Sequence, residues 1–271
     1  MSVAIDAPSN LKRLAFQILY WTGAVRLAAW LNRRHVVVLC YHGVTRRSTR
    51  HPDDRFGLQV REQRFRDHLD YLQRHYRVIS FRDYLRARDD QFELPDYSAV
   101  ITFDDGHRNF YTAAAPLLET HQMPALMFLI SNRVAANGAK PKTWLENDDQ
   151  DYLSWIEVNE LITRGFEFGS HTCSHQKLSQ IPPADAEREL SDSKRAIEQQ
   201  ITADGLPLAY PYGMTTNDIA KRAEALGYSC AFTTDTGFNN QTTQLFKLHR
   251  TLIGDDDDVP AFAARLAGLT R

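Results

Sequence analysis

Two adjacent carboxylates follow a short apolar run near residue 100. Ala99-Val100-Ile101 leads into the sequence TFDDG (102–106), so Asp104 and Asp105 stand side by side where a buried strand would end. Neighbouring like charges repel each other, and each resists losing its water. Asp-Gly is also an ordinary turn sequence, and an aspartate there can cap a following helix. The pair by itself therefore leaves a turn and a reaction centre as alternatives.

A second group of reactive side chains lies in the sequence HTCSH (171–175). Two histidines four residues apart can face the same way on a helical turn or a tight loop, which is the spacing of zinc ligands. A chance pair of surface or core histidines is the alternative. A carboxylate from another strand end would complete a catalytic zinc set of two histidines and one acid. One aspartate of the pair could then bind the cation while its neighbour faces the bound water as a base, and the cation would offset their repulsion.

The segments that must position these residues alternate between short apolar runs and longer amphipathic ones from Arg34 onward. We expect strands at 36–41, 99–103, 125–130, 166–170, 206–210, 230–234 and 247–253. We expect helices at about 61–75, 81–88, 108–121, 155–164, 184–201, 216–226 and 259–268. Such alternation predicts an α/β fold in which parallel strands are covered by helices. About seven units, with no Gly-x-Gly-x-x-Gly after the first strand, favour a barrel near the (β/α)₈ type over an open dinucleotide-binding sheet.

Polar or aromatic clusters end five of the expected strands. They lie at 41–43, 104–106, 171–175, 210–213 and 235–237. In βα barrels the carboxyl ends of the strands carry the chemistry. We therefore expect these five clusters to meet at one mouth of the barrel.

Composition excludes several classes of function. The chain has 271 residues, 43% of them hydrophobic, which is enough for one large domain or two small ones. A net charge of -2 argues against a general nucleic-acid binder. The three cysteines contain no Cys-x-x-Cys pair and indicate neither a disulfide framework nor a zinc ribbon. No Gly-x-Ser-x-Gly sequence supplies the nucleophile of a serine esterase.

Residues 1–34 form a predicted basic, helical extension, which leaves 35–271 as the catalytic domain. One face of the helix collects Leu11, Leu14, Ile18, Val25 and Ala29, and the surrounding positions hold Lys12, Arg13, Arg26, Arg33 and Arg34. Polar residues interrupt the apolar stretch, so it is neither a clear signal peptide, although an atypical one is an alternative, nor a membrane span. The helix either packs on the main domain or rests on an anionic membrane surface. We expect a cytoplasmic protein, in the second case peripheral to the inner face of the membrane.

The sequences TFDDG, HTCSH and YPYG, in that order, resemble the polysaccharide deacetylases of the NodB-homology type, carbohydrate esterase family 4. The resemblance runs from about residue 36 to 265 and includes LCYHGV, GYSCAFTTDTG and RTLI. It is strongest to the branch that acts on exopolysaccharides such as poly-N-acetylglucosamine. It implies a distorted (β/α)₇ barrel and a metal-dependent hydrolase that removes N-acetyl groups from the sugars of a poly- or oligosaccharide.

Carried over by position, the resemblance implies Asp104 as general base and Asp105, His171 and His175 as metal ligands. It implies zinc as the default cation, with other divalent ions as alternatives. It also implies a backbone N–H near Tyr212, next to Pro211, that helps to hold the oxyanion. Tyr212 and Trp155 could stack on a sugar ring, although packing is the simpler role for Trp155.

Two positions depart from the family pattern. The family often has an arginine that pairs with the base in Arg-x-Pro-Tyr, where this chain has Ala209, so the partner of Asp104 is undetermined. The family also places an acid histidine after Leu-x, whereas this chain has KLHR, which makes His249 the first candidate for the general acid and His42 the second. Arg250 is expected to contact substrate, to contact an acid such as Asp235, or to form a structural salt bridge.

Two other functions remain alternatives on these residues. One is a deacetylase or deformylase of a lipid-linked amino sugar or another small amide, which a membrane-resting helix would suit. The other is a glycan-binding protein without turnover, suggested by the alanine at 209.

Overall fold

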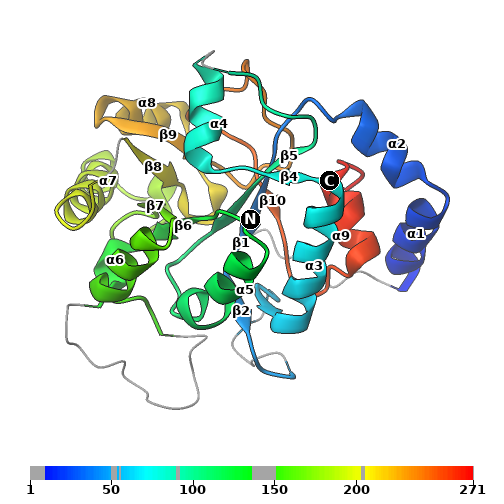
Figure 1. The fold of residues 1–271 in the computed structure, drawn as a ribbon. Coiled ribbons are helices and arrows are strands. Elements are labelled where there is room, and N and C mark those ends of the chain that lie inside the picture. Colours follow the sequence, from blue (N-terminus) through cyan, green and yellow to red (C-terminus); the bar gives the residue numbers. More distant parts are fainter. Residues whose placement is uncertain are drawn as a thin grey trace.

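A curled sheet of parallel strands forms the centre of the molecule, and helices surround it (Figure 1). The computed structural model describes residues 10–49, 54, 56–89, 92–135, 151–202 and 205–270. Seven strands follow the order β10-β1-β5-β6-β7-β8-β9, and β4 pairs with β5 from outside this path. Their bounds are β1 Val37–Tyr41, β4 Arg77–Val78, β5 Ser98–Phe103, β6 Leu126–Leu129, β7 Glu167–Ser170, β8 Leu206–Ala209, β9 Tyr228–Phe232 and β10 Thr251–Leu252. Each of the seven expected ranges therefore overlaps a strand of this sheet, with ends that differ by a few residues.

The segment before β10 brings the two edges of this sheet together. Phe232 in β9 forms an isolated parallel bridge with Leu248, and Leu248 leads into β10 at the other end of the strand order. The Leu248 N–H donates to the Ala231 carbonyl at 2.9 Å, and the Thr233 N–H donates to the Leu248 carbonyl at 2.9 Å. The arrangement is the distorted (β/α)₇ barrel that the family resemblance implied.

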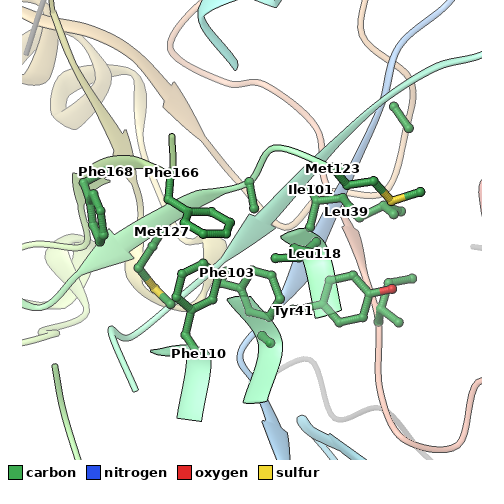
Figure 2. Packing of buried hydrophobic residues seen from close by; sticks show 14 of the residues in the cluster. Leu39, Tyr41, Ile101, Phe103, Phe110, Leu118, Met123, Met127, Phe166 and Phe168 are labelled. Atoms are coloured by element: carbon green, nitrogen blue, oxygen red, sulfur yellow. The ribbon is translucent and has the colours of Figure 1, made fainter. Parts of the chain in front are cut away.

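Alternation along the strands sends side chains to two separate cores. Leu39, Tyr41, Ile101 and Phe103 pack outward beneath the helices with Met127 and Phe110 (Figure 2). Val38, Val100, Phe128, Phe232 and Leu248 form the smaller cluster inside the curl of the sheet. Because successive strand residues point to opposite faces, the inner face of β5 runs from Val100 through Thr102 to Asp104. Asp104 is thus the next inward position after the apolar interior.

The surrounding helices follow their amphipathic segments closely. They are α3 Glu62–His75, α4 Phe81–Arg88, α5 Ala115–Thr120, α6 Trp155–Thr163, α7 Pro183–Glu198, α8 Asn217–Ala225 and α9 Val259–Leu266. The expected helix at 108–121 is split, because a π-helical turn over Phe110–Ala114 precedes α5. A small parallel pair, β2 Gly43–Thr45 and β3 Gln59–Arg61, extends the chain beyond β1.

The N-terminal extension is described from residue 10 and consists of two helices. α1 covers Asn10–Trp21 and α2 covers Ala24–Leu31, with Gly23 between them in the left-handed region at φ 82°. Glycine adopts that conformation without steric cost, and it ends the single helix that the sequence predicted. The extension packs beside α9 (Figure 1). Within the described residues no single helix is long and apolar enough to cross a membrane, although the bent pair, with 73° between its helices, passes the same test jointly.

Candidate active site

The ends of β5 and β7 bring one carboxylate and two imidazoles together. His171 Nε2 and His175 Nε2 each lie 3.6 Å from Asp105 Oδ1. The ligand atoms of the three residues all fall within 4.8 Å of one another, and no other such group of three occurs in the described part of the chain. This is the set that the sequence predicted as metal ligands.

Unusual backbone conformations aim these side chains. Asp105, Thr172, His175 and Tyr212 all have positive φ, between 58° and 74°, although none of them is glycine. Residues held in this region cost of order 1–3 kcal/mol each and persist where the surrounding structure fixes them. Around His175 the fixing contacts are visible, because the His175 N–H donates to Thr172 Oγ1 at 3.2 Å. Four such residues from three strand ends indicate a functional site.

The three residues fit a divalent cation. Asp105 Oδ1 is buried and has no hydrogen-bond partner, although both histidine Nε2 atoms lie near it. His171 Nδ1 donates to the Ala209 carbonyl at 2.8 Å, which leaves the Nε2 lone pair free for a ligand bond. Burial and the neighbouring His171 lower the pKa of His175 to about 4, so its imidazole is neutral at pH 7 as a ligand must be. Two histidines and one carboxylate form an established zinc-binding set.

Arg250 is the partner of Asp104. Its Nη1 donates to Oδ1 at 2.7 Å and its Nη2 donates to Oδ2 at 2.8 Å, in a bidentate pair that is almost fully buried. Arg250 Nε also donates to the Thr233 carbonyl at 3.0 Å, which fixes the plane of the guanidinium. Burial opposes ionisation of Asp104 and is the largest single influence on it. The charge and hydrogen bonds of Arg250, together with His171 and His42, outweigh burial and lower the pKa of Asp104 to about 2. Asp104 is therefore a carboxylate at neutral pH.

This pairing resolves the question raised by Ala209. Leu39 pairs with Thr251, so the preceding residue, Arg250, lies beside Val38. Arg250 therefore lies below the end of β5 and reaches Asp104 from within the barrel. Of the three expectations for Arg250, substrate contact is wrong because the side chain is fully buried. Contact with the Asp235 carboxylate is also not what the structure shows, since Asp235 is exposed and only its carbonyl accepts from the Arg250 N–H.

The two candidate acids lie in different surroundings. The His249 ring packs toward Gly237, and both its backbone groups bond to the Asn239 side chain. Since Leu248 belongs to the inner cluster and Arg250 points inward, the residue between them points outward. His42 directly follows β1. Burial lowers the pKa of His42, and the negative charges of Asp105 and Asp104 oppose that shift. Parallel pairing of Tyr41 with Phe103 places His42, the second candidate, level with Asp104, whereas the ring of His249 lies against Gly237.

The end of β8 contributes an aromatic rim. Pro211 is buried and begins a short 3₁₀ turn, Pro211–Gly213. Tyr212 is exposed, and its ring centre lies 4.7 Å from that of His175 and 5.0 Å from Lys177 Nζ. Trp155 is instead half-buried against the outer core at the start of α6, as its packing role predicted.

Two neighbours of the aspartates were not expected from the sequence. His107 Nε2 lies 3.5 Å from Asp105 Oδ2, and the His107 ring stacks on Tyr152 at 5.1 Å between ring centres. Cys40 Sγ lies 3.5 Å from Asp104 Oδ2 on the inner face of β1. Alternation along β1, with Val36 and Val38 inward, would have identified Cys40, whereas His107 follows the turn after β5 and carries no such periodic signal.

The fold and these residues together define a barrel enzyme with the donor set of a hydrolytic metal centre at the carboxyl ends of its strands. The family model of polysaccharide deacetylases matches residues 93–231, about half of the chain, and the chain belongs to this family. It is a hydrolase of the polysaccharide deacetylase type.

Individual relatives agree with this assignment. A putative polysaccharide deacetylase of Bacillus subtilis, YxkH, is 22% identical over 246 residues, covering 89% of this chain and 81% of the relative. The poly-beta-1,6-N-acetyl-D-glucosamine N-deacetylase of Escherichia coli is 26% identical over 261 residues, covering 85% of this chain and only 38% of the relative. The structure of the Streptococcus pyogenes deacetylase PplD in complex with acetate shares the fold with a TM-score of 0.73 at 22% identity, covering 86% of this chain and 98% of PplD.

Proposed function

We propose that this enzyme is a metal-dependent N-deacetylase of glycans that contain N-acetylglucosamine, with poly-β-1,6-N-acetylglucosamine as the first substrate to test. The observation that carries the proposal is the Asp105–His171–His175 group beside an aspartate that a buried arginine holds ionised. The substrate class is supported by relatives named as deacetylases of that polymer in Escherichia coli and Staphylococcus epidermidis. A lipid-linked amino sugar is the second candidate substrate, because the N-terminal helices could hold the enzyme at a membrane.

Asp105, His171 and His175 would hold the cation, for which zinc is the first candidate. When bound, such a cation supplies Lewis-acid chemistry, polarising the acetamide carbonyl and lowering the pKa of water from about 15.7 to about 7. His171 Nδ1 stays bonded to the Ala209 carbonyl and keeps the ring oriented.

Asp104 receives the proton of the attacking water. Arg250 occupies one lone pair on each carboxylate oxygen, and Cys40 Sγ donates to Oδ2 at 3.5 Å, which leaves the second lone pair of Oδ1 to accept the proton. Water adds to the acyl carbon, the C–N bond breaks, and the products are acetate and a free amine. The Tyr212 N–H, in the short turn Pro211–Gly213 that follows β8, would donate to the developing oxyanion.

His42 is our proposed acid for the leaving amine. It lies in the field of both aspartates, whereas His249 points toward Gly237. The non-catalytic alternative loses its support, because it rested on the absence of an arginine partner for Asp104 and Arg250 supplies that partner.

Acetate release from β-1,6-linked N-acetylglucosamine oligomers tests the proposal. We expect release by the zinc-loaded enzyme, loss with a chelator, and recovery when zinc is returned. Asp104→Asn and His42→Ala should each lower kcat at least 100-fold, whereas His249→Ala should retain most activity. A fully zinc-loaded enzyme that releases no acetate from these oligomers would refute the assigned substrate.

A further inference from the structure

The outer face of the two N-terminal helices is apolar, and none of the described residues covers it. On α1, Leu11, Leu14, Ile18 and Trp21 recur at helical spacing, and each is at least half exposed. On α2, Leu27, Trp30 and Leu31 do the same. Of these, Trp21 is 80% and Leu11 is 77% exposed. Contiguous apolar surface of this kind marks an interaction site on a folded protein.

The opposite face of the same helices is anchored to the barrel. Val25 is buried, and Phe16 and Tyr20 pack against the outer core. Arg13 Nη2 lies 3.4 Å from Asp256 Oδ1, in the loop that follows β10. The start of α1 therefore lies at the end of the barrel that carries the active site. A helix pair that packs on the barrel along one face and exposes apolar side chains along the other is suited to bind a flat apolar surface.

The charges around the bare face indicate what that surface is. Residues 10–34 contain five basic side chains and no acidic one. Arg33 additionally stacks on Trp30, with its guanidinium carbon 4.7 Å from the ring centre. Apolar side chains, tryptophans and basic residues without acids are the composition of helices that insert at the interface of an anionic bilayer. A second copy is disfavoured, because a two-fold contact would place the same basic face against itself.

We propose that α1 and α2 form a monotopic docking surface for anionic phospholipid membranes, with Leu11, Leu14, Ile18, Trp21, Leu27 and Trp30 entering the interface. The proposal is independent of the reaction that the barrel carries out. It places the active-site end of the barrel beside the lipid surface, where membrane-held glycans would be accessible.

Flotation of the full-length protein with lipid vesicles tests the proposal. We expect binding to vesicles of phosphatidylcholine with 30% phosphatidylglycerol, and weaker binding to pure phosphatidylcholine. The triple variant Leu14→Gln/Ile18→Gln/Trp21→Gln should lose binding by at least tenfold. Because the three side chains are exposed, the variant should keep its fold and its thermal midpoint. The matched control Ile156→Gln/Ile162→Gln, which removes exposed apolar residues from α6, should bind as the wild type does.

The electrostatic part has its own variant. Lys12→Gln/Arg26→Gln should lower partitioning onto the anionic vesicles by about tenfold and leave partitioning onto neutral vesicles unchanged. Failure of the wild type to float with anionic vesicles would overturn the proposal. It would equally be overturned if light scattering showed a dimer that the triple variant abolishes, since the occupant would then be a second copy.

Discussion

Arg250 determines how Asp104 behaves, and its effect is local to a few atoms. Two short charged hydrogen bonds in a buried setting hold one carboxylate in one orientation and keep it ionised. Such a pair is a weak source of net stability, because desolvation of both ions offsets their attraction. Removing one partner is a different matter, since the other charge is then left buried and alone.

Substitution of Arg250 is therefore predicted to impair both folding and catalysis. Arg250→Gln should lower the free energy of unfolding by about 3–5 kcal/mol, measured by urea denaturation. Arg250→Lys should retain more stability but lose at least tenfold in kcat, because an ammonium cannot make the bidentate contact. The acid limb of the kcat profile should move to higher pH in both variants, as the pKa of Asp104 rises without its guanidinium. An unchanged pH profile would contradict the role of Arg250 in keeping Asp104 ionised.

The sequence pattern could have shown that Arg250 points into the barrel and His249 away from it, but it could not have shown that Arg250 pairs with Asp104. Leu248 is apolar, and alternation from it directs Arg250 inward and His249 outward. The contact with Asp104 spans 146 residues of sequence, and it depends on the stagger of β10 against β1, which no local pattern encodes.

At the scale of elements, strand ends and the turns after them set the site. β5 and β7 are not adjacent, since β6 lies between them, yet the positive-φ residues after each strand turn Asp105 and His175 toward each other. Strand positions were predictable from apolar runs to within a few residues. The residues with positive φ were not predictable, because none of them is glycine, which is the residue that most strongly indicates a positive φ.

Gly169 in β7 shows how tightly that strand is held. A Cβ built on it would lie 2.7 Å from the Phe128 ring and 2.8 Å from the Pro207 carbonyl oxygen. Gly169→Ala is predicted to lower the free energy of unfolding by about 1–3 kcal/mol and to reduce activity, since His171 follows two residues later. The control Gly165→Ala meets no atom within 4 Å and strains only its φ of 90°, so it should cost about 1 kcal/mol and leave activity intact. Equal activity in the two variants would contradict the positioning role of β7.

The whole molecule is a barrel with the N-terminal extension, α1 and α2, packed on its side. Seven strand–helix units and their polar ends were sufficient to predict the barrel and its mouth. The N-terminal extension was predicted as one helix because the helical spacing of its apolar residues continues through Gly23. Only the folded structure shows the bend at that residue. Which of its faces packs on the barrel depends on complementary surface from α9, which lies more than 200 residues away.

Acid stability is a property of the whole fold to which Asp104 contributes measurably. Its pKa is about 2 when folded and its ordinary value is 3.8, so its contribution is present above pH 3.8 and is lost as pH falls through 2. The difference corresponds to about 2 kcal/mol. In urea denaturation, the stability gap between the wild type and Asp104→Asn should be constant from pH 6 to 5 and should shrink by about this amount near pH 2. A gap that does not change with pH would contradict the ionised, paired state.

The metal content of the purified protein tests the central claim most directly. Elemental analysis should find about one divalent ion per wild-type chain and none in the folded double variant His171→Ala/His175→Ala. A wild-type chain that binds no metal even after reconstitution with zinc would contradict the account, because Asp105 and the two histidines would then have no cation to hold.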